Sequence, residues 1–84
     1  MTLTDTILIC LNRVKPYLHR ESALLLDVKA ENRALNPSRT ELRLGCDQLE
    51  AQHQIVAMRE DDGPGAQHKY KITQLGEARV AEIS

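Results

Sequence analysis

The sequence predicts a small α+β domain in which three helices precede a β-hairpin and a short helix closes the chain. Apolar residues recur at helical spacing as far as about residue 52. The period then changes to two over residues 55–58 and 69–72, and a glycine- and proline-containing stretch separates these two segments. At 84 residues the chain has room for one domain, which we assign to residues 1–84.

The first helix is predicted to begin after an N-cap at Thr4, with Leu3 and Leu8 placed as a hydrophobic staple. Proline removes an amide donor and clashes with the preceding turn, so Pro16 makes residues 15–19 a joint. The helix carries an apolar stripe formed by Ile7, Leu11, Val14 and Leu18.

A second helix is expected over residues 21–32, with Leu24, Leu25 and Val28 on one face. Residues 33–35 then form the turn before the third helix, and Leu35 points inward.

The third helix is predicted over residues 37–52, with Asn36 as its N-cap and Pro37 at the first helical position. Its apolar stripe consists of Leu42, Gly45, Cys46 and Leu49. His53 stands where such helices often end in glycine, so either it adopts a left-handed conformation or the helix exit is built differently.

The hairpin is expected from the alternation of Ile55 and Ala57 with Val56 and Met58, and of Tyr70 and Ile72 with Lys69 and Lys71. Residues 61–65 supply its turn. Thr73 can cap a last helix that carries Leu75, Ala78 and Ile83, and a small third strand is possible at a position that the sequence does not give.

Composition narrows the classes of partner. The chain has two Tyr and no Trp or Phe, which removes the usual stacking surface for single-stranded nucleic acid. A net charge of -1 and a pI near 6.3 argue against a dedicated nucleic-acid binder, which is commonly basic. Duplex DNA or a protein surface remains as the partner.

Cys10 and Cys46 fall on predicted apolar helix faces, which indicates buried free thiols in a reducing compartment. His19, His53 and His68 show no ligand spacing, so we expect no metal and no cofactor. The sequence contains no recognisable nucleophile with a base and no phosphate-binding glycine loop, so we do not expect an enzyme. The short apolar run near the N-terminus is not followed by a cleavage site, and we expect a soluble cytoplasmic protein.

Several segments together resemble the winged helix-turn-helix superfamily, particularly small bacterial or phage transcriptional regulators. The resemblance covers nearly the whole chain and consists of residue types in order. Leu42, residues 46–50, residues 55–56 and Arg59 look like a recognition helix leading into the first wing strand, and residues 70–73 followed by Gly76 look like the second wing strand running into a closing helix.

The resemblance implies sequence-specific binding of double-stranded DNA by a transcriptional regulator, with helix 37–52 in the major groove and residues 60–68 as the wing. Carried over residue by residue, it nominates Ser38, Arg39, Thr40 and Arg43 for base edges or nearby phosphates, His68, Lys69, Lys71 and Gln67 for wing contacts, and Lys29 and Arg33 for phosphate. Glu41 is expected to set specificity or to pair with an arginine.

Three features support an alternative in which the same fold only binds protein. Leu44 lies on the face that would enter the groove, Asp61 and Asp62 make the wing tip acidic, and residues 36–53 have a net charge of -1. Ile9, Leu26 and Leu44 lie off the apolar stripes, and we expect a homodimer formed through the first helix, the last helix or both.

Overall fold

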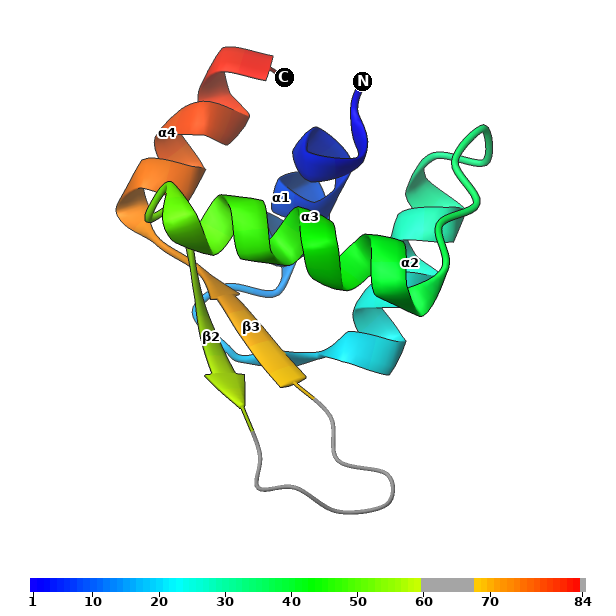
Figure 1. Ribbon diagram of the computed structural model, residues 1–84. Coiled ribbons are helices and arrows are strands. Elements are labelled where there is room, and N and C mark those ends of the chain that lie inside the picture. The colour runs from blue at the N-terminus through cyan, green and yellow to red at the C-terminus, as the bar shows by residue number, and fades with distance from the viewer. Residues whose placement is uncertain (60–67, 84) are drawn as a thin grey trace.

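The computed structural model describes residues 1–59 and 68–83, and its helices cover one face of a small antiparallel sheet (Figure 1). In chain order the elements are α1 (Leu3–Arg13), β1 (His19–Arg20), α2 (Glu21–Glu31), α3 (Arg39–Ala51), β2 (Ile55–Arg59), β3 (His68–Ile72) and α4 (Gln74–Ile83). The predicted order of three helices, a hairpin and a closing helix is confirmed. The predicted wing tip, with Asp61, Asp62 and Gln67, lies outside the described residues.

The sheet has the strand order β1-β3-β2, and both strand pairs are antiparallel. Ile55 lies opposite Ile72, and Ala57 lies opposite Tyr70. Because directly opposed residues point to the same face, these side chains form the inner face that the helices cover. β1 supplies the third strand, with His19 opposite Tyr70.

Both α1 and α3 begin at places other than those predicted. The N-cap of α1 is Thr2, whose hydroxyl accepts from the amide of Asp5 at 3.2 Å, and that of α3 is Ser38, whose hydroxyl accepts from the amide of Glu41 at 3.1 Å. In each case the carboxylate of the acidic residue accepts a hydrogen bond from the amide of the cap residue, which completes a capping box. The predicted N-caps Thr4 and Asn36 were therefore wrong. Each true cap lies two residues from the predicted one, and its capping box satisfies amides of the first helical turn that have no partner within the helix.

The buried core draws on every helix and on the inner face of the sheet. Its members are Ile7, Leu8, Cys10, Leu11, Leu24, Val28, Leu42, Cys46, Leu49, Ile55, Tyr70, Ile72 and Val80. The predicted stripe of α3 is confirmed in full, since Gly45 is buried as well. Leu18 does not belong to the stripe of α1, because the helix ends at Arg13 and leaves Leu18 39% exposed.

Of the two alternatives predicted for His53, the structure has the left-handed conformation, with φ of 61°. The amide of His53 donates to the carbonyl of Glu50 at 3.0 Å, and that of Gln54 donates to Leu49 at 2.9 Å. This is the pairing of a Schellman motif, and it turns the chain from α3 into β2.

Helix α4 packs through Gly76 and Val80, and not through the predicted Leu75 and Ala78, which are exposed. A Cβ at position 76 would stand 2.2 Å from the carbonyl oxygen of Gln54. The glycine therefore permits a backbone approach that no other residue allows, and this approach decides which face of α4 is buried. Thr73 caps the helix as predicted, because its hydroxyl accepts from the amide of Gly76 at 3.2 Å.

Candidate nucleic-acid interface

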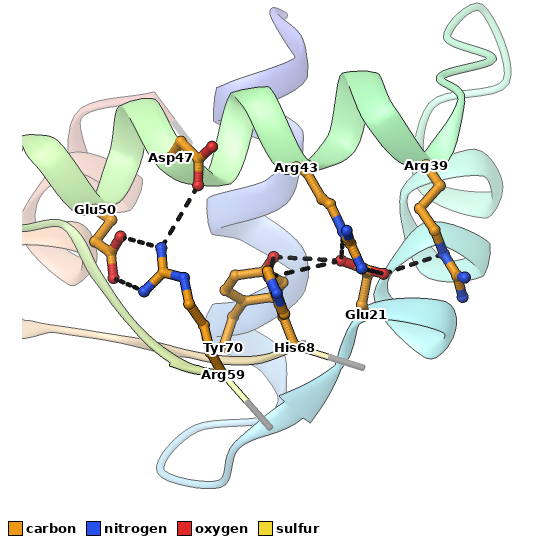
Figure 2. Close-up of polar contacts among 8 residues, drawn as sticks. All are labelled: Glu21, Arg39, Arg43, Asp47, Glu50, Arg59, His68 and Tyr70. Atoms are coloured by element: carbon orange, nitrogen blue, oxygen red, sulfur yellow. Dashed lines mark hydrogen bonds and ion pairs between the residues drawn. The ribbon is translucent and has the colours of Figure 1, made fainter. Parts of the chain in front are cut away.

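The candidate site is built around Glu21, a carboxylate that is fully buried at the start of α2. Arg43 of α3 donates from Nε to Oε2 of Glu21 at 2.6 Å and from Nη2 to Oε1 at 3.1 Å. Arg39, one turn earlier, places its Nε 3.0 Å from Oε1 (Figure 2). The two arginines that the sequence nominated for DNA therefore meet at one carboxylate.

These contacts explain why a charge can be buried at this position. An unpaired carboxylate inside a small domain would cost several kcal/mol in lost hydration, whereas a two-pronged guanidinium replaces much of that hydration. The hydrogen bond from Arg43 to Glu21 raises the pKa of the guanidinium above its usual value, so Arg43 stays charged. The arginines remain accessible, since the side chain of Arg39 is 50% exposed and that of Arg43 is 39% exposed.

Strand β3 joins the same cluster from the side of the sheet. The hydroxyl of Tyr70 lies 3.5 Å from Oε2 of Glu21, and Nδ1 of His68 lies 3.2 Å from that hydroxyl. Burial raises the pKa of the Tyr70 hydroxyl, which therefore stays protonated and able to donate. Glu21 thus connects the start of α2, the first half of α3 and the strand that leaves the predicted wing.

A second ion cluster lies towards the C-terminal end of α3 (Figure 2). Arg59 of β2 donates to Glu50 at 2.7 and 3.3 Å and lies 3.8 Å from Asp47. The hydrogen bond from Arg59 lowers the pKa of Glu50, and the nearby backbone amide of Ala57 lowers it further. The carboxylates of Asp47 and Glu50 outnumber the one guanidinium of Arg59, so the C-terminal end of α3 is acidic. The two arginines of α3 lie in its first half.

The other nominated residues lie in separate places. Ser38 is occupied as the helix cap, whereas Thr40 is exposed in the first turn of α3. Lys29 is half-buried near the far end of α2, and Arg33 is exposed in the turn that follows. The structure therefore does not bring Lys29 and Arg33 to the Glu21 cluster.

Lys69 and Lys71 lie on the opposite face of the sheet from His68, because successive side chains of a strand alternate between the two faces. His68 lies on the inner face with Tyr70, while Lys69 lies opposite Met58 and Lys71 lies opposite Val56. Both lysines therefore point to the outer face of the sheet. Of the nominated residues that the structure describes, only Arg39, Arg43 and His68 gather around Glu21.

Sequence reasoning missed Glu21, and of its two alternatives for Glu41, a role in specificity or a pairing with an arginine, the pairing is wrong. Glu41 is the partner of the Ser38 cap and not of an arginine. Glu21 was detectable in principle, because it precedes Leu24, Leu25 and Val28 by three, four and seven positions and so shares their buried face. A buried carboxylate at such a position requires a cationic partner, and Arg39 and Arg43 of the next helix are the candidates.

The two cysteines are free and buried, as predicted. Burial raises the pKa of the Cys10 thiol to about 11 and that of Cys46 to about 12. Within the described part of the chain, no three histidine, cysteine, aspartate or glutamate residues are grouped so that they could hold a metal ion. None of the helices described between residues 3 and 83 has the length and apolar character to cross a bilayer.

Comparison with known proteins gives a likeness in structure but not in sequence. No protein-family model matches the chain, and no curated protein matches it. Among solved structures, a PadR family transcription regulator from hypervirulent Clostridium difficile R20291 superimposes with a TM-score of 0.73 at 12% sequence identity. The match covers 96% of this chain and 81% of that regulator. With its helices, its three-stranded antiparallel sheet and this likeness, the chain has the winged helix-turn-helix fold.

Proposed function

We propose that the protein binds double-stranded DNA in a sequence-specific manner as a regulator of transcription, with α3 in the major groove. The observation that carries the proposal is the pair Arg39 and Arg43, which Glu21 fixes on the accessible first half of α3. The likeness to a transcription regulator of the same fold supports it.

The geometry suits base reading more than simple charge attraction. Arg39 contacts Glu21 through Nε, which leaves the fork of its two terminal nitrogens for the O6 and N7 atoms of a guanine. Arg43 uses Nε and Nη2 on Glu21, so it is held in one orientation on the helix surface. Thr40 between them offers a hydroxyl that can donate or accept.

The charge of the site favours DNA more than the helix sequence alone suggests. Arg39 and Arg43 exceed the buried carboxylate of Glu21 by one positive charge, and the exposed carboxylate of Glu41 in the first turn of α3 offsets that charge, so this half of the helix is balanced where residues 36–53 as a whole are acidic. The acidic residues Asp47 and Glu50 lie at the other end of α3, next to Arg59. A duplex that meets the first half of α3 therefore approaches the cations, and binding should weaken steeply as salt rises.

The direct test is selection of a randomised duplex pool by the purified protein at low salt, followed by sequencing of the retained DNA. Enrichment of a defined motif supports the proposal. Retention that is salt-sensitive but not enriched in any sequence contradicts specific reading. An inverted repeat would also support the homodimer that we propose through α1, α4 or both, because the half-site spacing reports the two-fold axis.

Alanine variants test whether Arg39 and Arg43 contact the DNA. Arg39→Ala should reduce affinity for the selected motif by about fivefold to about a hundredfold, because one bidentate base contact contributes about 1–3 kcal/mol. Arg79→Ala is the matched control, since Arg79 pairs with Asp5 and Glu82 near α4. Unchanged affinity of the double variant Arg39→Ala and Arg43→Ala, with the fold intact, would remove these residues from the mechanism.

A second candidate function, protein binding without specific DNA recognition, is favoured by Leu44. Its side chain is 60% exposed on α3, beside a hollow lined by Thr2, Leu3, Thr4, Glu41, Gly45 and Gln48. Leu44→Asp would abolish capture of a protein partner if this function holds, and DNA affinity would stay at its non-specific level. Either activity is proposed for the cytoplasm.

A further inference from the structure

The outer face of the sheet carries a cluster of exposed apolar side chains that the proposed function does not use. Tyr17, Leu18, Val56 and Met58 are 74, 39, 48 and 52% exposed. All of them line one hollow, together with Pro16, Ala57 and Lys71. Single exposed apolar residues are normal on a protein surface, but a contiguous group beside a hollow is typical of an interaction site.

Basic side chains share this face. Arg20 lies opposite Lys69, which lies opposite Met58 on the other side of β3, so these side chains point the same way. Lys71 lies opposite Val56 and joins them. Among the described residues of the three strands, the outer-facing positions hold no acidic residue. Glu77 lines a neighbouring hollow with Val56 and Lys71, but it is paired with Lys15 at 2.6 Å. The outer face therefore combines apolar surface with positive charge.

This surface is distinct from the arginine cluster of α3. His68 and Tyr70 point from β3 towards Glu21 on the inner face, whereas Lys71 points to the outer face. A ligand of the outer face therefore need not displace a duplex from α3.

We propose that the outer face of the sheet docks an acidic, apolar segment of a protein partner. Carboxylates of the segment pair with Arg20 and Lys71, and its apolar side chains fill the hollow between Tyr17 and Met58. This surface is independent of DNA binding by α3, and its failure would leave that function standing.

Charge complementarity selects this occupant over two others. Duplex DNA would supply anions, but its backbone offers little apolar surface for Tyr17, Leu18, Val56 and Met58 to cover. A second copy of the chain in a two-fold dimer would place this face against itself and bring its cations together. An acidic segment with apolar side chains satisfies both parts of the surface.

The test uses fluorescent peptides of about ten residues, enough to follow two strands at roughly 3.3 Å per residue. One peptide alternates Glu with Leu, a second replaces each Leu by Ser, and a third replaces each Glu by Lys. We expect only the Glu-Leu peptide to bind the full chain, and to shift the amide resonances of Arg20, Val56, Met58 and Lys71 in the ¹⁵N-labelled protein.

Variants on and off the face make the test specific. Lys71→Glu and Met58→Thr should each weaken peptide binding by about fivefold or more, while Arg79→Ala and Leu26→Thr leave it unchanged. The substituted side chains at positions 58 and 71 are on the surface, and equal thermal midpoints would establish that the variants fold. Equal binding of the Glu-Ser peptide, or resonance shifts centred on α3, would overturn the proposal. So would self-association in sedimentation that Met58→Thr removes, which would assign the face to a second copy.

Discussion

Arg43 of α3 donates two hydrogen bonds to the buried carboxylate of Glu21, at 2.6 and 3.1 Å. The pair joins the two helices of the helix-turn-helix unit by a charge contact where a small domain would ordinarily use apolar packing. Its energetic and functional roles can be separated by experiment.

The stability role of the pair is measured by a double-mutant cycle. Arg43→Leu should lower the free energy of unfolding by about 1–3 kcal/mol, because Glu21 stays buried with weaker compensation from Arg39. The double variant Glu21→Leu and Arg43→Leu should recover much of that loss, since apolar replacement of a buried pair is often close to neutral. Urea unfolding of the four proteins gives the coupling energy, and strictly additive effects would mean that the two side chains do not interact.

The functional role of Glu21 is tested by Glu21→Gln, which keeps the side-chain size and removes the charge. The freed guanidiniums should raise affinity for random duplex and lower the ratio of specific to random binding. The salt dependence should steepen by about 0.9 in logarithmic slope for each further phosphate that the variant neutralises. Fluorescence anisotropy at several salt concentrations measures this, with Glu31→Gln as the control because Glu31 pairs with Arg13 away from α3. A variant with unchanged slope and unchanged discrimination would restrict Glu21 to stability.

Two glycines are expected to respond oppositely to alanine. Gly76→Ala should destabilise the protein by about 1–3 kcal/mol, because the new Cβ would meet the Gln54 carbonyl oxygen at 2.2 Å and Ile72 at 2.6 Å. In Gly45→Ala the new Cβ would meet the terminal Cδ1 of Ile7 at 3.1 Å and would lie in ordinary contact with Leu3 at 3.6 Å. Because the end of the Ile7 side chain can shift by a few tenths of an ångström, the helix propensity of alanine should leave stability unchanged or raised by up to about 1 kcal/mol. Thermal unfolding of the two variants in parallel decides the matter, and equal destabilisation would show that the close approach at Gly76 is not special.

The buried thiols predict a loss of stability in alkaline solution. The pKa values of Cys10 and Cys46 rise from 9.0 to about 11 and about 12 in the folded protein, mainly through burial. The unfolded chain therefore releases these protons first, so their contribution to stability is complete below pH 9 and is lost as the pH rises towards 11 and 12. Urea unfolding across this range should show a falling free energy, with a shallower slope for Cys46→Ala. A slope that the variant does not change would exclude Cys46 as its source.

The parts of the fold that sequence predicted are those in which local pattern and tertiary packing agree. Leu42, Cys46 and Leu49 recur at helical spacing and are buried, and the alternation of Tyr70 and Ile72 with lysines matches the two faces of the sheet. The left-handed conformation of His53 was one of two alternatives that its position after α3 offered, and the structure has it. The local sequence pattern determined the conformation and burial of these residues, and no contact with a distant part of the chain overrode it.

The errors arose where a distant or reciprocal contact decided the outcome. The burial of α4 depends on Gly76 meeting the backbone of Gln54, which no property of the α4 sequence reveals. β1 has two residues and is defined by its pairing with β3, so it carries no periodicity of its own. Glu21 was missed because its partners lie on another helix, although its position on the stripe of α2 indicated that it would be buried.

The contact of Glu50 with the amide of Ala57 has a consequence for the behaviour of the protein at high concentration. β2 is an outermost strand, and its register with β3 turns the amide of Ala57 towards the side where another chain could pair. The carboxylate of Glu50 lies near that amide, which lowers its pKa, and Arg59 holds the carboxylate in place with two hydrogen bonds. The same ion pair that makes the end of α3 acidic thus protects an exposed sheet edge, with its apolar Val56 and Met58, from strand addition and aggregation.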